Sequence, residues 1–132
     1  MPLSLKLIFV FSAIGVLDTL YLIYHMVKKT DVACWFFPRE WCRKVQHSPW
    51  SKTLGVPNSV AGLAIYLLIL TLGFFYLQGL VPFLSLQIII GVGFLFSMYF
   101  TFIQAFVLRA FCTWCVISAI NFIVMAAAAF VL

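Results

Sequence analysis

The sequence predicts an all-α integral membrane protein, a four-helix transmembrane bundle with a cysteine-bearing loop between helices 1 and 2. Two observations support this fold class. Of the 132 residues, 66% are hydrophobic and 8% are charged, whereas a soluble domain is about half apolar and about a quarter charged. Four apolar segments also approach or exceed the roughly 20 residues that a helix needs to cross a bilayer. Helices satisfy their own backbone hydrogen bonds, as lipid requires.

The four helices are expected to form a single membrane domain over residues 1–132. We predict them at about residues 5–26, 58–78, 84–109 and 111–131. Turn-forming residues mark two of the breaks, with Gly55 and Pro57 before the second helix and Gly79 and Pro82 before the third. A secretory signal peptide is the alternative for the first apolar run. That run is longer than usual and is followed by no clear small-residue cleavage motif.

The segment of about residues 27–57 is the one sizeable polar region, and it is the predicted redox loop. It holds Cys34, Cys42 and most of the charged residues, together with aromatic residues of the kind that favour a membrane interface. The aromatic residues are Trp35, Phe36, Phe37, Trp41 and Trp50. We expect a packed lid over the mouth of the bundle, with a short amphipathic helix from Pro38 to Val45. A floppy loop with interfacial anchors is the alternative.

A Cys-x-x-Cys motif, Cys112-Thr113-Trp114-Cys115, heads the fourth helix. Residues three apart share a helix face, and the positive end of the helix dipole favours a thiolate there. Arg109 adds a positive charge nearby. Because the thiolate is the nucleophile in disulfide exchange, the motif predicts a redox dithiol. Zinc binding is the alternative, but it usually needs a second such pair, so we expect no metal.

All four cysteines should lie on one face of the membrane, because an even number of crossings separates the loop from the link at Arg109. Seven of the eight basic residues lie on that face as well. They are Lys28, Lys29, Arg39, Arg43, Lys44, Lys52 and Arg109. The positive-inside rule then favours the cytoplasm for the cysteine face of a multi-pass cell-membrane protein. Disulfide chemistry usually belongs outside the cytosol, so the extracytoplasmic face is the alternative.

The formal net charge of +5 would also suit a nucleic-acid-binding protein. Here, however, the basic residues cluster in one loop beside the membrane spans. We therefore expect membrane lipid as a partner and no nucleic acid.

The chain resembles the vitamin K epoxide reductase family, and its bacterial and archaeal disulfide-forming homologues more closely than the animal enzymes. The resemblance covers nearly the whole chain. It depends on four features, which occur in this order: Asp18-x-x-Tyr21-Leu22, the loop pair Cys34 and Cys42, Gly55-Val56-Pro57-Asn58-Ser59 with Gly62 and Tyr66, and Cys112-Thr113-Trp114-Cys115. The other familiar quinone-linked four-helix enzymes carry their Cys-x-x-Cys in the first loop and fit less well.

The resemblance implies a membrane thiol:quinone oxidoreductase that makes protein disulfides. In this scheme a separate thioredoxin-like partner attacks near Cys34, and Cys42 relays the electrons to Cys112. Cys115 then passes them to a bound quinone of the ubiquinone or menaquinone type. Many members carry a fused thioredoxin-like domain, whereas here the partner is expected to be another protein. The direction of electron flow stays open, because a dithiol–quinone couple runs either way.

Five residues are expected near the quinone: Asn58, Asp18, Gln104, Asn121 and Phe111. Asn58 matches an asparagine that contacts the quinone-like substrate in the animal enzymes, and it would also suit a helix cap. Asp18 lies roughly 10 Å from the loop end of its helix. Its carboxyl group could bond a neighbouring helix or manage protons for the quinone, because carboxylates inside membranes usually face a partner or a cavity. Ala119 stands where the animal enzymes commonly have tyrosine, which argues against epoxide reduction.

Two other classes of function fit parts of the sequence. A metal-binding or structural membrane protein would use the four cysteines as a zinc site. A small transporter would use Asp18 as its proton site. The sequence leaves the identity of the quinone, the partner and the oligomeric state open.

Overall fold

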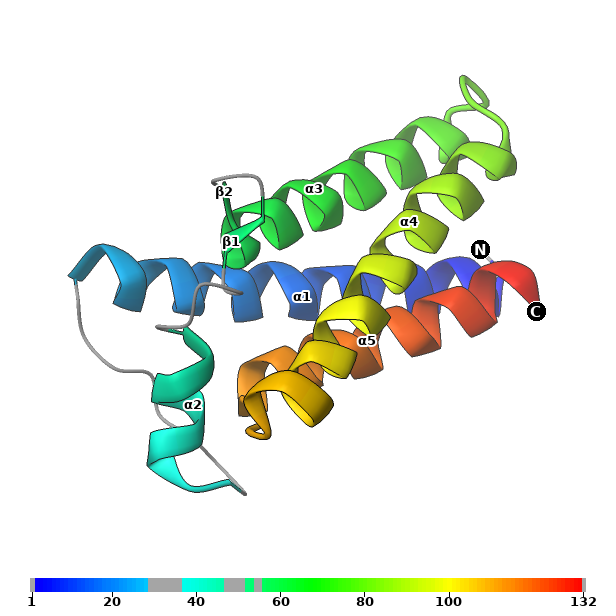
Figure 1. The fold of residues 1–132 in the computed structure, drawn as a ribbon. Helices are drawn as coiled ribbons and strands as arrows, with labels where there is room; N and C mark the ends of the chain where they lie inside the picture. Colours follow the sequence, from blue (N-terminus) through cyan, green and yellow to red (C-terminus); the bar gives the residue numbers. More distant parts are fainter. Residues whose placement is uncertain (1, 29–36, 47–51, 54–55, 132) are drawn as a thin grey trace.

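The computed structural model describes residues 2–28, 37–46, 52–53 and 56–131, and its architecture is a bundle of long helices (Figure 1). The long helices are α1 (Leu3–Lys28), α3 (Asn58–Leu77), α4 (Phe83–Phe102) and α5 (Thr113–Phe130). A π-helical turn, η2 (Ile103–Leu108), prolongs α4. With η2 counted as part of α4, the described residues contain four helices long and apolar enough to cross a membrane. The predicted all-α membrane bundle is therefore confirmed.

The loop between α1 and α3 contains a short amphipathic helix, α2 (Arg39–Gln46), close to where the sequence predicted one. Cys42 and Val45 are fully buried on one side of it, while Arg43 and Lys44 are exposed on the other. Two-residue strands, β1 (Lys52–Thr53) and β2 (Val56–Pro57), pair antiparallel just before α3 begins. The predictions for Cys34, Trp35, Phe36 and Trp50 concern residues outside the described part of the loop.

The turn between α3 and α4 follows from its glycine and proline. Gly79 has a φ of 76°, a conformation that only glycine adopts without steric cost. Its N–H donates to the Tyr76 carbonyl oxygen at 3.0 Å, and the Leu80 N–H donates to the Phe75 carbonyl oxygen at 2.9 Å. These bonds close the end of α3. Pro82 then precedes α4 in an extended conformation.

The helices pack in the order α1, α3, α4, α5, and α5 returns to lie beside α1. Helices α1 and α5 run in opposite directions, and the two chain termini lie together at one end of the bundle (Figure 1). Helix α2 lies at the other end, where α1 finishes, α3 starts, η2 finishes and α5 starts (Figure 1). The segments that carry Cys42, Cys112 and Cys115 therefore meet at the same end.

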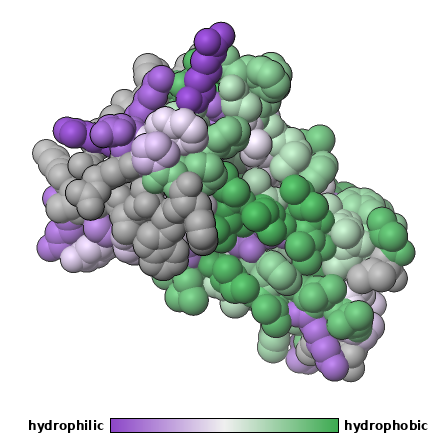
Figure 2. Space-filling model, turned by 90° about the horizontal axis from the view of Figure 1, so that it is seen from below, coloured by the Kyte–Doolittle hydropathy of each residue, from purple (hydrophilic) through white to green (hydrophobic). Residues whose placement is uncertain are grey.

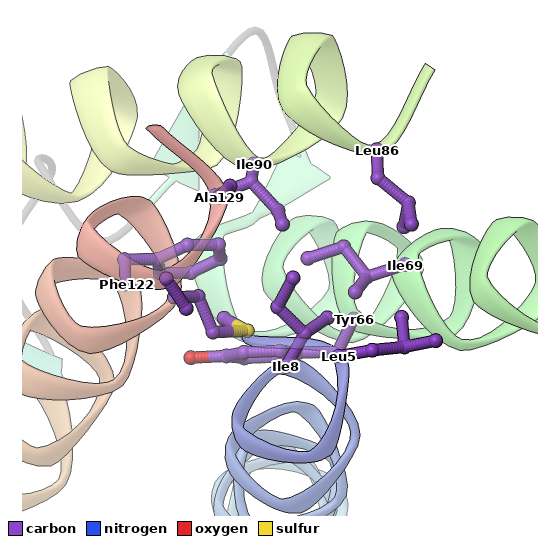
Figure 3. Close-up of a cluster of buried hydrophobic side chains, with 10 residues drawn as sticks. Leu5, Ile8, Tyr66, Ile69, Leu86, Ile90, Phe122 and Ala129 are labelled. Carbon is purple, nitrogen blue, oxygen red and sulfur yellow. The ribbon is translucent and has the colours of Figure 1, made fainter. Parts of the chain in front are cut away.

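The bundle is held together, from its middle to the end that carries the chain termini, by the central cluster, to which all four long helices contribute (Figure 3). Its buried members are Leu5, Ile8, Tyr66, Ile69, Leu86, Ile90, Phe122, Met125, Ala128 and Ala129. The Tyr66 ring stacks on the Phe122 ring, with centroids 4.9 Å apart. It also presses on α1, since a Cβ atom at Gly15 would lie 2.2 Å from two of its ring carbons. Small residues allow this close approach, which is how helices associate in lipid.

The outer surface is apolar over most of its length, as Figure 2 shows in green, with hydrophilic residues gathered mostly toward the ends. Large hydrophobic side chains on all four long helices point outward, including Leu17 at 69% exposure, Leu95 at 68% and Phe74 at 56%. A soluble monomer rarely exposes such a continuous apolar surface. The surface therefore faces lipid, and the chain is a membrane protein.

Candidate functional site

The Cys-x-x-Cys motif lies where α5 begins. Cys112 is the N-cap residue of α5, with an extended conformation of φ −97° and ψ 129°, and Cys115 lies in the first turn. Both carry thiols in this structure. The Cys112 side chain is fully buried, whereas that of Cys115 is half-buried. The inner cysteine is thus shielded and the outer one is accessible from its surroundings.

Cys42 and Cys112 are brought together in the cysteine cluster, a set of eight buried residues at the loop end of the bundle. Its members are Leu22, Cys42, Val45, Phe100, Ile103, Leu108, Ala110 and Cys112. Cys42 and Cys112 are each 0% exposed, and the half-buried Cys115 packs against the same cluster. Cys42 takes part in a disulfide bond. Cys34, the other predicted loop cysteine, lies outside the described residues.

Aromatic side chains cover the cysteine cluster from the loop side. The Phe37 ring stacks on Trp41 with centroids 5.7 Å apart, and it lies 5.9 Å from the ring of Phe111. Tyr21 of α1 and Trp114 pack against the same cluster, with ring centroids 4.5 Å apart. Phe37 and Trp41 of the described loop thus pack against Phe111, whereas the predicted lid also involves Trp35, Phe36 and Trp50, which lie outside the described residues. Phe111 is also a predicted quinone contact.

Asp18 lies inside α1 and is only 4% exposed. Neither carboxyl oxygen has a hydrogen-bond partner among the described residues. Asp18 lies one turn after Gly15, against which the Tyr66 ring packs. A buried polar group without a partner carries a desolvation cost that folding does not recover. Such a group in a native structure calls for a functional explanation.

A polar group beneath the cysteine pair ties α3 to α5. The Tyr66 hydroxyl lies 2.6 Å from the Ser118 hydroxyl, one helical turn below Cys115. The Asn121 side chain interacts with the same tyrosine, and it is 2% exposed. Its Nδ2 atom has no hydrogen-bond partner within the described part of the chain. Asp18 and Asn121 therefore both have buried polar atoms without a hydrogen-bond partner among the described residues.

The remaining predicted quinone contacts have different surroundings. Gln104 lies in η2 and is 1% exposed, and its Oε1 atom accepts a hydrogen bond from the Cys112 N–H at 3.0 Å. Asn58 is the first residue of α3 and is half-buried. Ala119 is buried in α5. The structure thus gathers Asp18, Asn121 and the active pair around Tyr66, while Gln104 contacts the backbone of the pair.

Among the described residues, which do not include Cys34, no group of three or more His, Cys, Asp or Glu side chains is arranged to hold a metal ion.

Sequence reasoning did not assign roles to Ser118 or to the π-helical turn. The spacing of Ser118 could have indicated a role near the redox pair, because it lies three residues after Cys115 and so on the same helix face. Tyr66 was noted only through the family resemblance, although a hydroxyl in the middle of a span usually seeks a partner. The wider turn of η2 has no sequence signature, because it depends on how the end of α4 meets the start of α5.

Comparison with known proteins agrees with this geometry. The vitamin K epoxide reductase family model matches residues 6–130 of the chain. A comparison with curated proteins finds no match. The family match covers nearly the whole chain and includes the Cys-x-x-Cys motif, the loop cysteines and nearly all of the four spans. The chain belongs to the vitamin K epoxide reductase family and is a membrane oxidoreductase that acts on thiols.

Proposed function

We propose that this protein is a thiol:quinone oxidoreductase that generates protein disulfides. The observation that carries the proposal is the burial of Cys42 and Cys112 in one cluster, with Cys115 packed against it. Two redox pairs that meet in a protected interior can exchange electrons without losing them to solvent thiols. The observed state is also one that such a relay would pass through, with Cys42 oxidised while Cys112 and Cys115 carry thiols.

The proposed relay has two exchange steps and one electron-transfer step. A thioredoxin-like protein reduces the loop pair, Cys34 and Cys42, and leaves with its own disulfide. The Cys42 thiolate then attacks Cys112 in the Cys112–Cys115 disulfide, and Cys115 leaves as a thiolate. Cys34 next attacks Cys42, which restores the loop disulfide and leaves Cys112 and Cys115 reduced. Each exchange breaks one S–S bond and forms another, so two electrons move inward.

The surroundings of Tyr66 fit a quinone as the final acceptor. A quinone takes up two electrons and two protons, and it presents carbonyl oxygens as hydrogen-bond acceptors. The unsatisfied Nδ2 atom of Asn121 is a donor of the required kind, and the Asp18 carboxyl group can hold a proton nearby. Asn58 is proposed as a further contact. Cys115 is the proposed electron donor to the quinone, because its side chain is more exposed than that of Cys112.

The cysteine face is proposed to lie in the cytoplasm. Lys28, Arg43, Lys44 and Arg109 are exposed at this end of the bundle, whereas Lys6 lies near the other end. Short segments rich in lysine and arginine stay on the cytoplasmic side. The partner would then be a cytoplasmic thioredoxin-like protein, and the extracytoplasmic face is the alternative that a labelling experiment decides.

The direct test is quinone reduction by the purified protein, supplied either with a reduced thioredoxin-like donor or with a small dithiol. Loss of turnover with both donors is expected for Cys112→Ala and Cys115→Ala. The variants Cys34→Ala and Cys42→Ala should fail with the protein donor but still use the small dithiol. Full activity without Cys112 or Cys115, or stoichiometric zinc with no reducible disulfide, would contradict the proposal.

A further inference from the structure

The link between α4 and α5 has an unusual backbone for a connection of four residues. Helix α4 widens into the π-helical turn η2, and Arg109 then adopts a left-handed conformation with a φ of 53°. It is the one described non-glycine residue with a positive φ. Non-glycine residues persist in such a conformation only where their surroundings enforce it, and π-helical turns are frequent at functional sites.

Gln104 accepts three hydrogen bonds along this path. Its main-chain carbonyl oxygen accepts hydrogen bonds from the N–H of Arg109 and from the N–H of Ala110, the latter at 3.0 Å. Its side-chain Oε1 atom accepts the Cys112 N–H at 3.0 Å. One fully buried residue thus satisfies three of the backbone donors between the two helices. Donors at such a helix junction have no partner within a helix of their own.

These hydrogen bonds constrain the backbone of Cys112. Its N–H is held by Gln104 of η2, and its carbonyl oxygen accepts the Val116 N–H of α5 at 2.9 Å. The cysteine is therefore fixed to both helices at once. Ile103 and Leu108, which flank Gln104 in η2, pack in the cysteine cluster together with Cys42. The two hydrogen bonds to the Cys112 backbone thereby restrict where its sulfur lies relative to Cys42.

We propose that Gln104 is a positioning residue for disulfide exchange between Cys42 and Cys112. This inference deepens the proposed function, since it concerns the step in which the Cys42 thiolate attacks the Cys112 sulfur and Cys115 leaves. Exchange requires that the attacking sulfur reach one particular sulfur of the disulfide, and small displacements from the reactive geometry cost rate steeply. In this proposal Gln104 acts through the backbone of Cys112, whose N–H its side chain accepts.

The test measures formation of the Cys42–Cys112 disulfide in the full chain carrying Cys34→Ser and Cys115→Ser. Diamide, a two-electron oxidant, takes two electrons and two protons from the two thiols, and mass spectrometry of non-reduced peptides follows the product. Gln104→Met keeps the length of the side chain but lacks the acceptor, and it should form the bond about tenfold more slowly. Gln104→Glu keeps an oxygen acceptor and should restore most of the rate.

Gln87→Met is the matched control. Gln87 lies on the same helix, and its Nε2 atom donates to the Ala129 carbonyl oxygen of α5 at 2.9 Å. This change also removes an α4–α5 hydrogen bond, but at the opposite end of the bundle. It should leave the exchange rate unchanged. If Gln87→Met slows exchange as much as Gln104→Met does, or if Gln104→Glu is as slow as Gln104→Met, the positioning role is wrong.

A second measurement distinguishes failure of this inference from failure of the proposed function. It does not use the chain that carries Cys34→Ser and Cys115→Ser. In the protein with all four cysteines, Gln104→Met should lower kcat with the protein donor and leave KM for that donor unchanged. If the wild-type protein reduces no quinone, but Gln104→Met still slows formation of the Cys42–Cys112 disulfide, only the proposed function is overturned. Active wild type with no effect of Gln104→Met in either assay would overturn the inference alone.

Discussion

The substitution Gly93→Ala tests the packing between α4 and α5, and Gly91→Ala on the same helix is its control. A Cβ atom at position 93 would lie 2.3 Å from Cε1 and 2.8 Å from Cζ of the Phe122 ring. A Cβ atom at position 91 would meet its nearest neighbour, Cζ of Phe130, at 3.7 Å, which is ordinary van der Waals contact. The two changes are chemically identical and two residues apart.

The magnitudes follow from two opposing terms. Replacing glycine by alanine in a helix gains about 1 kcal/mol of helix propensity at either position. Overpacking a tight contact costs about 1–3 kcal/mol, and only Gly93 incurs that cost. We therefore expect Gly91→Ala to be neutral or stabilising. Gly93→Ala should lie about 1–3 kcal/mol below it in free energy of unfolding.

Unfolding in mixed detergent micelles, followed by far-ultraviolet circular dichroism, measures both variants. Adding Phe122→Leu to Gly93→Ala should recover part of the loss, because the smaller side chain makes room for the new methyl group. A positive coupling energy in this double-mutant cycle is the expected signature of direct contact. Equal stability of Gly91→Ala and Gly93→Ala would refute the packing of α4 on α5 described above.

Three further predictions concern the site and the topology. Asp18→Leu should raise the free energy of unfolding by about 1–3 kcal/mol, because it removes an unsatisfied buried group, and it should slow quinone reduction; a destabilised variant would make the carboxyl group structural. Tyr66→Phe removes the hydrogen bond to Ser118 and should cost about 0.5–1.5 kcal/mol in the same unfolding assay, whereas no loss would mean that this bond contributes nothing to stability. In a cysteine-free background in intact cells, a membrane-impermeant maleimide should label Gly79→Cys but not Arg43→Cys, and the reverse pattern would place the cysteine face outside the cytoplasm.

Much of the fold follows from the sequence because lipid imposes few choices. An apolar segment of about 20 residues must be helical in a membrane, so four such segments predict the bundle. Gly79 and Pro82 mark the turn between α3 and α4, where Gly79 has a positive φ and Pro82 is the extended N-cap of α4. The amphipathic α2 was likewise predictable, since its buried and charged residues alternate with helical spacing.

The parts that sequence could not predict depend on contacts between distant segments. The bond from Gln104 to Cys112 exists only because η2 widens the end of α4, and no single residue encodes that. Tyr66 and Ser118 are 52 positions apart and meet through helix packing. Gln104 was predicted as a quinone contact because it is polar within a span, whereas its side chain bonds the backbone of the redox pair.

The most informative single measurement is the quinol yield of the fully reduced protein, mixed anaerobically with excess quinone and without any other donor. Wild type holds two cysteine pairs and should form two quinols per chain, with the loss of all four thiols. A variant with Cys42→Ser should form one, from the active pair alone, and one with Cys112→Ser should form none. Quinol formation by Cys112→Ser, or none by wild type, would contradict the relay from the loop through the active pair to the quinone.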